Sequence, residues 1–268
     1  MKTFTGYQKG VNLGGWLSQN ELTEKHLASY ILEDDIQKIA GWECDHIRLP
    51  IDYELLRDEN GNDKESGYSY IDSCISWCKK YGLNIILDLH KTAGFSFDAE
   101  ENNFFNSVQL QEKFMQLWEE LASRYGKYSS FLTFELLNEV VDPNVIDLWN
   151  QIIKQTITRI RKIAPSVKII IGGVCNNSVQ FVKTLEKPFD ENIIYTFHFY
   201  EPLIFTHQGA YWIKTMDTSY RTRFPCPLEE YIADTEKYLL PDHMYFYKNL
   251  KCKNADKEMF EEVFAEAI

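Results

Sequence analysis

The sequence predicts an α/β fold of the (β/α)8 barrel type, and three observations indicate it. Short runs rich in β-branched residues and leucine recur along the chain. Amphipathic segments, with apolar residues three and four positions apart, lie between these runs. Polar or ionisable residues follow one run after another, which is typical of a barrel because its active-site residues gather at the carboxyl ends of the strands.

Six runs are expected to form parallel strands, because strands that alternate with helices build parallel sheets. The expected strands are residues 10–13, 46–50, 83–89, 131–137, 167–172 and 193–199. The amphipathic segments predict helices at residues 71–78, 114–125 and 146–163. Six βα units are therefore recognisable, and the (β/α)8 barrel is expected to be incomplete.

The rest of the chain is less regular. Residues 201–227 carry aromatic and turn residues, and they predict a long loop over the active site. A polar helix is expected near residues 228–240, and residues 256–268 predict a last helix with one apolar face and no stop signal. We expect a single catalytic domain over residues 1–268, with the C-terminal part of the barrel missing.

Alternating strands and helices also fit an open, doubly wound sheet, so the alternation alone does not predict a barrel. The polar strand ends favour the barrel. No Gly-x-Gly-x-x-Gly follows an early strand, and Gly14-Gly15 leads to Trp16 rather than to a helix that could hold phosphate. A nucleotide site is therefore not expected.

Composition excludes several classes of function. The 268 residues are 44% hydrophobic and 15% aromatic, which supplies a large core, and the formal net charge is -12. Nucleic acid and anionic membranes are not expected as partners, because both require basic surfaces. The acidic, aromatic-rich surface fits a neutral ligand, although acidity is also a common means of staying soluble.

Targeting signals and disulfide patterns are not apparent. The six cysteines show no Cys-x-x-Cys spacing, so free thiols are expected. No apolar signal core precedes Gly10, and no apolar run approaches a membrane span. We expect a cytoplasmic protein, or a secreted one if a signal peptide has been removed.

The segment 136–139 is the most informative part of the sequence. It ends an apolar strand with Asn138 and Glu139. A buried carboxylate is costly to desolvate, and such a setting raises the pKa of a glutamate, as a general acid at neutral pH requires. The alternative is a solvated Glu139 at the start of the next helix.

Five segments in order resemble glycoside hydrolase family 5, whose members are cellulase-like (β/α)8 barrels. They are residues 10–17, 46–50, 87–90, 134–139 and 195–202. The resemblance implies a glycosidase that hydrolyses O-glycosidic bonds of a β-glucan or related polysaccharide. It further implies a retaining mechanism with two carboxylates and no metal or cofactor.

The resemblance also implies roles for individual residues. Glu139 would be the acid/base that protonates the leaving oxygen, and Asn138 would hydrogen-bond the sugar 2-OH. Arg48 and His90 would line the floor of the same subsite, while His198 and Tyr200 would hold the acid/base and the nucleophile in place. The alternatives are an ion pair for Arg48, hydrogen-bonded core histidines, and packing for Tyr200.

Two features depart from the family pattern. Val140 follows Glu139 where the family commonly has proline. More seriously, retaining enzymes need a second carboxylate about 5 Å from the first, the family places it at the end of strand seven, and no seventh strand is recognisable. Glu201 and Asp217 lack the buried strand-end setting that a nucleophile needs, and four further glutamates lie on the polar side of the last helix: Glu258, Glu261, Glu262 and Glu266.

These departures define the expected behaviour of the chain. We expect the nucleophile to be absent from it and the chain by itself to be a poor catalyst. The alternative function is a truncated or degenerate barrel that binds carbohydrate without turnover. The open sheet edges at residues 10–13 and 193–199 would allow self-association.

Aromatic residues on predicted loops are candidates for stacking on sugar rings. Trp212 and Trp16 are the substrate-binding candidates, with further rings at Tyr53, Phe95, Phe97, Phe104 and Tyr211. A third class of function, a metal-dependent barrel hydrolase, would use Asp88, His90 and His198 as ligands. It ranks lowest because the sequence has neither a His-x-His pair on a strand nor a His-Glu-x-x-His helix.

Overall fold

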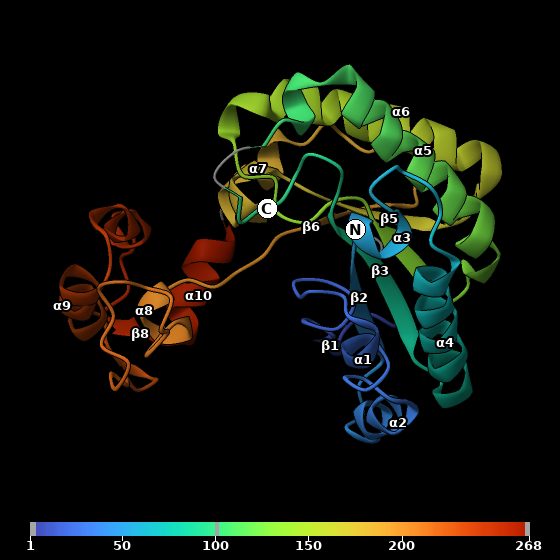
Figure 1. The fold of residues 1–268 in the computed structure, drawn as a ribbon. Helices are drawn as coiled ribbons and strands as arrows, with labels where there is room; N and C mark the ends of the chain where they lie inside the picture. The colour runs from blue at the N-terminus through green and yellow to red at the C-terminus, as the bar shows by residue number, and fades with distance from the viewer. Residues whose placement is uncertain (1–3, 100–101, 266–268) are drawn as a thin grey trace. The chain divides into compact units, whose positions relative to one another are not determined.

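The computed structural model describes residues 4–99 and 102–265, and the chain divides into two compact units (Figure 1). The first unit contains the chain up to Asn177 together with Thr184–Thr196. The second contains Ser178–Lys183 and the chain from Phe197 onward. The single catalytic domain that we expect over residues 1–268 stays a prediction.

The first unit is built on a sheet of six parallel strands in the order β1-β2-β3-β4-β5-β6. The strands are β1 (Gly10–Asn12), β2 (His46–Asp52), β3 (Asn84–Lys91), β4 (Leu132–Glu135), β5 (Lys168–Gly172) and β6 (Ile193–Thr196). All six predicted strands are therefore confirmed. The central strands are buried on both faces, which explains their nearly continuous apolar sequence.

Helices connect successive strands of this sheet. The longer ones are α2 (Glu33–Gly41), α4 (Glu65–Tyr81), α5 (Val108–Tyr125) and α6 (Ile146–Ile163), and the short ones are α1 (Glu24–Leu27) and α3 (Tyr53–Leu56). α2 packs against α4, and α5 packs against α6. α5 begins where the Ser107 side chain accepts from the Leu110 amide, and α4 ends at Gly82, whose φ of 73° suits a residue without a side chain.

This order of strands and helices is the (β/α)8 barrel type, with six units recognisable. The described residues do not close the sheet, so β1 and β6 are its two edges. Self-association through these edges stays a prediction. After β5 the connection contains only short helical segments, α7 (Val174–Asn177) and η4 (Val179–Thr184), and the first helix after β6 is the short α8 (Leu203–Thr206).

Two strand ends differ from the predicted ones. β6 ends at Thr196 rather than at residue 199, because Thr196 pairs with Gly172, the last residue of β5. β5 stops there because the chain turns at Cys175, Asn176 and Asn177, which have φ between 52° and 57°. β4 ends at Glu135, and the segment beyond it makes single backbone hydrogen bonds, from Leu136 to Ile170 and from Asn138 to Leu89.

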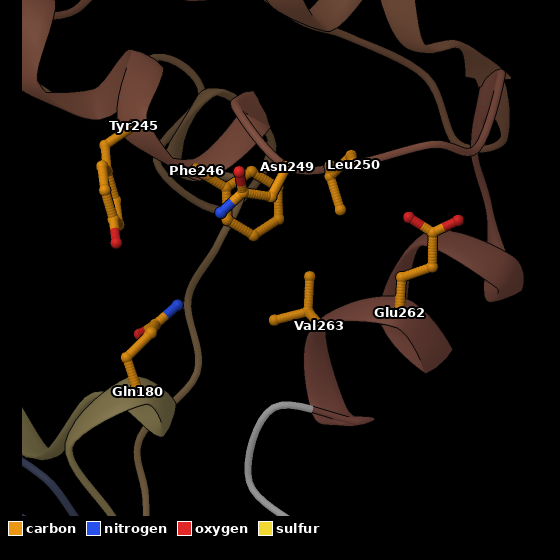
Figure 2. A pocket seen from close by; sticks show the side chains of 7 residues that line it. All are labelled: Gln180, Tyr245, Phe246, Asn249, Leu250, Glu262 and Val263. Carbon is orange, nitrogen blue, oxygen red and sulfur yellow. The ribbon is translucent and has the colours of Figure 1, made fainter.

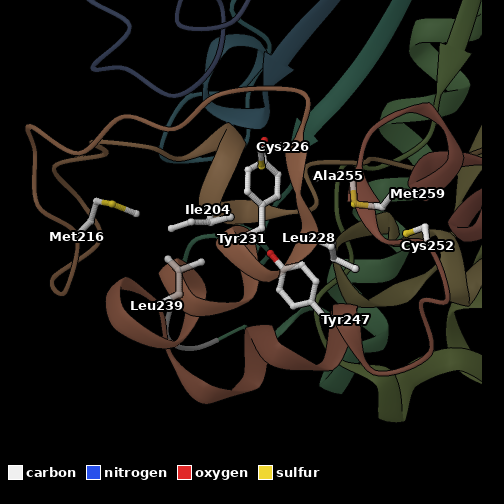
Figure 3. Packing of buried hydrophobic residues seen from close by; sticks show 10 residues of the cluster. All are labelled: Ile204, Met216, Cys226, Leu228, Tyr231, Leu239, Tyr247, Cys252, Ala255 and Met259. Atoms are coloured by element: carbon white, nitrogen blue, oxygen red, sulfur yellow. The ribbon is translucent and has the colours of Figure 1, made fainter.

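The second unit has a hydrophobic core of its own (Figure 3). Tyr231 and Tyr247 lie at its centre, and Ile204, Met216 and Met259 pack around them. Its elements are α8, β7 (Cys226–Pro227), α9 (Leu228–Tyr238), η5 (Pro241–Tyr247), β8 (Asn254–Ala255) and α10 (Lys257–Phe264). The expected loop at residues 201–227 is therefore part of a packed unit, because its apolar residues are buried with those of α9 and α10.

The predicted helices of this unit are confirmed with shorter bounds. α9 ends at Tyr238, and α10 ends at Phe264, while residues 266–268 of the predicted last helix lie outside the described residues. All six cysteines are free thiols, as expected. No helix in the described part of the chain is both long and apolar enough to cross a membrane.

Candidate active site

Arg48 on β2 joins the carboxylates of two neighbouring strands. Its Nε and Nη2 donate to Glu135 on β4 at 2.7 and 2.9 Å, and Nη2 also lies 2.9 Å from Oδ2 of Asp88 on β3. Asp88 and Glu135 are register partners, so their side chains lie on the same face of the sheet. The Arg48 side chain is 17% exposed, and the side chains of Asp88 and Glu135 are 0% and 4% exposed. A single cation thus balances two buried anions.

Asn138 is fixed by the same guanidinium group. Arg48 Nη2 donates to Asn138 Oδ1 at 3.0 Å, and Nη1 donates to Asn12 Oδ1 at 2.9 Å. Because a guanidinium group only donates hydrogen bonds, Asn138 must turn its oxygen toward Arg48. The Nδ2 end of Asn138, which carries two donor hydrogens, is therefore directed elsewhere.

His90 lies at the end of β3, two residues after Asp88, so the two side chains share a face of the sheet. His90 Nδ1 is 2.7 Å from Asp88 Oδ2, and the ring packs edge-on against Phe97 at 5.2 Å. Burial raises the pKa of Asp88, and the Arg48 guanidinium opposes this shift.

Glu139 lies beyond the end of β4 and is partly exposed. Its φ of 43° is in the left-handed region, which costs a residue with a side chain about 1 kcal/mol or more. The Asn176 side-chain Nδ2 donates to Glu139 Oε2 at 3.4 Å, and the Asn176 backbone N–H donates to the Val140 carbonyl at 3.0 Å. The turn after β5 therefore holds the segment that carries Glu139.

Buried tryptophans hold the same strand ends from outside the sheet. The Trp118 indole N–H on α5 donates to the Leu136 carbonyl at 3.0 Å. The Trp149 indole N–H on α6 donates to the Gly172 carbonyl at 3.0 Å. Leu136 follows β4 and Gly172 ends β5, so these two hydrogen bonds fix the chain at the carboxyl ends of both strands.

The structure thus brings Arg48, His90 and Asn138 into one network, and Glu139 follows directly. The sequence argument for a buried carboxylate applies to Glu135 and Asp88 rather than to Glu139, which is more exposed. Glu135 and Asn12 were not among the predicted site residues. The available signal for Glu135 was a carboxylate two strands away from Arg48 in the sheet, in a strand that is otherwise apolar.

Three other predicted site residues, His198, Tyr200 and Trp212, belong to the second unit. Tyr200 packs edge-on against His207 at 5.9 Å, and His207 packs edge-on against Trp212 at 6.1 Å. Tyr211 adds a further edge contact to Trp212 at 5.0 Å, and the Trp212 side chain is 63% exposed. His198 is partly exposed. His207, whose pKa is lowered by burial, joins two predicted substrate residues and was not predicted itself.

Trp16 does not have the surface position that a substrate-stacking residue needs. It is 0% exposed, its indole N–H donates to the Leu27 carbonyl at 2.9 Å, and its ring stacks on Trp77 at 6.2 Å. We therefore correct its assignment from substrate binding to core packing. Phe95 and Phe104 are also buried in the core.

Two hollows differ in what they can hold. One, of about 50 Å³, lies within the second unit between the Tyr245 ring, the Gln180 amide and Val263 (Figure 2), and it is too small for a sugar ring. The other, of about 220 Å³, lies in the first unit beside the end of β3 and is lined by Glu54, Lys91 and Asn103 among others. Within the described ranges, no three His, Cys, Asp or Glu side chains are grouped to hold a metal ion.

The sequence model of cellulases, glycosyl hydrolase family 5, matches residues 7–263. The chain belongs to glycosyl hydrolase family 5. Among its relatives, Cellodextrinase A of Ruminococcus flavefaciens is 48% identical over 221 residues, covering 82% of this chain and 66% of the relative. Endoglucanase C of Acetivibrio thermocellus is 39% identical over 270 residues, covering 98% of this chain and 77% of the relative.

Solved structures agree with the family 5 assignment. The endoglucanase Cel5A of Thermotoga maritima has a TM-score of 0.71 and 25% identity, covering 86% of this chain and 73% of that one. The same enzyme has been solved in complex with cellobiose. The chain spans about two thirds of the length of the cellodextrinase and about three quarters of that of Endoglucanase C and of Cel5A.

Proposed function

We propose that the chain is the catalytic part of a glycosidase that hydrolyses β-linked glucan, with Glu139 as the acid/base. The observation that carries this proposal is the Arg48–Asn138 contact in a family 5 chain, because it orients the residue directly before Glu139. Relatives named cellodextrinase and endoglucanase support glucose-based substrates. A neutral glucan also suits an acidic protein with exposed aromatic rings.

In the proposed mechanism Asn138 donates from Nδ2 to the 2-OH of the sugar whose bond is cleaved. Glu139, protonated, gives its proton to the glycosidic oxygen as the bond between that oxygen and the anomeric carbon breaks. A second carboxylate attacks the anomeric carbon and is later displaced by water, with Glu139 then acting as base. Arg48 keeps Asn138 oriented throughout, and His90 borders the same subsite.

The second carboxylate is expected on a strand that the described residues do not form. The resemblance places it at the end of a seventh parallel strand, and residues 4–99 and 102–265 form six. That the chain alone is a poor catalyst stays a prediction. We propose that Tyr200 and His198 act near the catalytic carboxylates and that Trp212 stacks on a sugar ring.

Release of reducing ends from a soluble β-1,4-glucan tests this function. Azide is added in a parallel series, because it can attack the anomeric carbon in place of a missing carboxylate while Glu139 still protonates the leaving oxygen. Glu139→Gln should lower both rates by about 10²–10⁴-fold. Glu43→Gln is the matched control, since Glu43 is exposed and also has a positive φ, 60°.

Binding separates this proposal from its alternative. Calorimetric titration with a cello-oligosaccharide should show binding by the wild-type chain and by Glu139→Gln. Binding without product in either series, azide included, would favour a sugar-binding barrel without turnover. No binding and no product would remove β-glucan as the substrate.

A further inference from the structure

Asp88 makes contacts that the proposed mechanism does not use. It lies in the middle of the sheet on β3 and is 0% exposed, and its Oδ2 accepts two hydrogen bonds. One comes from Arg48 Nη2 at 2.9 Å, and the other partner is His90 Nδ1 at 2.7 Å. Its second oxygen, Oδ1, is buried without a hydrogen-bond partner among the described residues. The polar contacts of the Asp88 side chain therefore converge on one oxygen.

These contacts determine which nitrogen of His90 carries the proton. Arg48 always donates, so Asp88 Oδ2 must act as an acceptor toward it. A proton on Oδ2 would lie beside the Arg48 cation, so a proton on Asp88 would sit on Oδ1 instead, and Oδ2 would still accept. Since Oδ2 accepts, His90 Nδ1 must donate, and in a neutral ring Nε2 is then left with a lone pair.

The position of His90 places the unprotonated Nε2 at the end of the sheet where the substrate is expected to bind. His90 is at the carboxyl end of β3, and the backbone N–H of Asn138 donates to the carbonyl of Leu89, the residue before His90. The two side chains thus border the same end of the sheet. Asn138 presents donor hydrogens there through Nδ2, so an acceptor on His90 would complement it in binding sugar hydroxyls, which donate and accept.

We propose that Asp88 is a positioning residue that holds His90 in the tautomer protonated at Nδ1, so that Nε2 accepts a hydrogen bond from a substrate hydroxyl. The tautomer itself does not depend on the function proposed above, whereas the identity of the hydroxyl as that of a β-glucan does. Arg48 ties the two halves together, because its Nη2 contacts both Asp88 and Asn138.

The difference between the two Asp88 oxygens makes two substitutions informative. In Asp88→Asn, the amide oxygen can take the place of Oδ2 and accept from both Arg48 and His90, while the NH2 group takes the place of Oδ1. The tautomer of His90 should therefore be kept. In Asp88→Ala the acceptor is lost, and nothing then holds the proton on Nδ1.

Nitrogen-15 NMR of the histidine rings measures this directly, at mildly alkaline pH, with His90 assigned from the signals lost in His90→Gln. The chain carries internal references for both tautomers. His26 Nε2 lies 2.6 Å from the Gly15 carbonyl, which only accepts, so His26 must be protonated at Nε2. His46 Nδ1 lies 2.7 Å from Asp45 Oδ1 and should resemble His90.

The expected result is a protonated Nδ1 and an unprotonated Nε2 for His90 in the wild type and in Asp88→Asn, and loss of that state in Asp88→Ala. Asp52→Ala, which removes another buried aspartate, should leave His90 unchanged. A protonated His90 Nε2 in the wild type would overturn the proposal even if no variant folds. So would an unchanged His90 tautomer in a folded Asp88→Ala.

Activity provides the link to the substrate. With azide present as the external nucleophile, Asp88→Ala should lower kcat/KM on cello-oligosaccharides by about 10²-fold, the loss expected when a group is misplaced, and Asp88→Asn should recover most of it. Equal losses in the two variants would overturn the role of the tautomer in binding substrate. If the wild type neither binds nor cleaves β-glucan, the proposed function fails, while the NMR result still decides the tautomer.

Discussion

Replacing Arg48 by methionine is predicted to destabilise the first unit strongly at neutral pH. Methionine keeps much of the length of the arginine side chain but removes the cation that contacts both Asp88 and Glu135. The two carboxylates belong to residues that are 0% and 3% exposed, so neither can be rehydrated without opening the sheet. Removing one partner of a buried ion pair typically costs about 3–5 kcal/mol.

Urea unfolding of wild type and Arg48→Met, followed by tryptophan fluorescence, measures this loss. Arg159→Met is the matched control, because Arg159 also makes a two-pronged contact with a carboxylate, Glu112, but on a partly exposed helix surface. The control should lose only about 0–1 kcal/mol. A loss below about 1 kcal/mol for Arg48→Met would refute the reasoning, because it would mean that the carboxylates are not buried as charges.

Burial and exposure lead to three further predictions. The pKa of Asp88 is raised in the folded state, so its contribution to stability is present below the unfolded pKa of about 4 and is lost as the pH rises through the folded pKa. In urea titrations the stability of Asp88→Asn relative to wild type should therefore increase with pH. A decrease would mean that the pKa of Asp88 is lowered. Trp16→Ala should cost about 3–5 kcal/mol of unfolding free energy, and a loss near zero would contradict its place in the core. Trp212→Ala should leave stability within about 0.5 kcal/mol but weaken cello-oligosaccharide binding in calorimetry by about 1 kcal/mol, and unchanged affinity would remove Trp212 from the site.

The regular part of the fold could be predicted from the sequence because its signals are local. The apolar spacing in residues 146–163 reproduces α6 residue for residue, and each of the six apolar runs is a strand. Strand ends could not be predicted in the same way. β6 stops where its neighbour β5 stops, and that depends on the turn at Cys175–Asn177 rather than on the sequence of β6.

The second unit shows another limit. Its core joins Ile204, Met216, Tyr231 and Met259, of which each is 12 to 28 residues from the next along the chain. Such a core has no period that a sequence window can detect, so residues 201–227 were predicted as a loop. Composition indicated the turns but not the packing.

The site could be predicted where strand ends carry polar residues, and it could not where contacts cross strands. Arg48, His90, Asn138 and Glu139 could be predicted from their places near the carboxyl ends of apolar runs. The pairing of Arg48 with Glu135 joins residues 87 positions apart, and it depends on the register of three strands. Trp16 is predicted to bind substrate because it lies on a predicted loop after the first apolar run, whereas its burial depends on Leu27 and Trp77.

The central claim is that Glu139 is the acid that protonates the leaving group. The most direct test is kcat/KM for wild type and Glu139→Ala on aryl β-cellobiosides whose phenols differ in acidity, with azide present as an external nucleophile. The account predicts a loss of about 10²–10⁴-fold for the least acidic phenols and only a small loss for the most acidic one, which leaves without a proton. An equal loss across the whole series would contradict the acid role of Glu139.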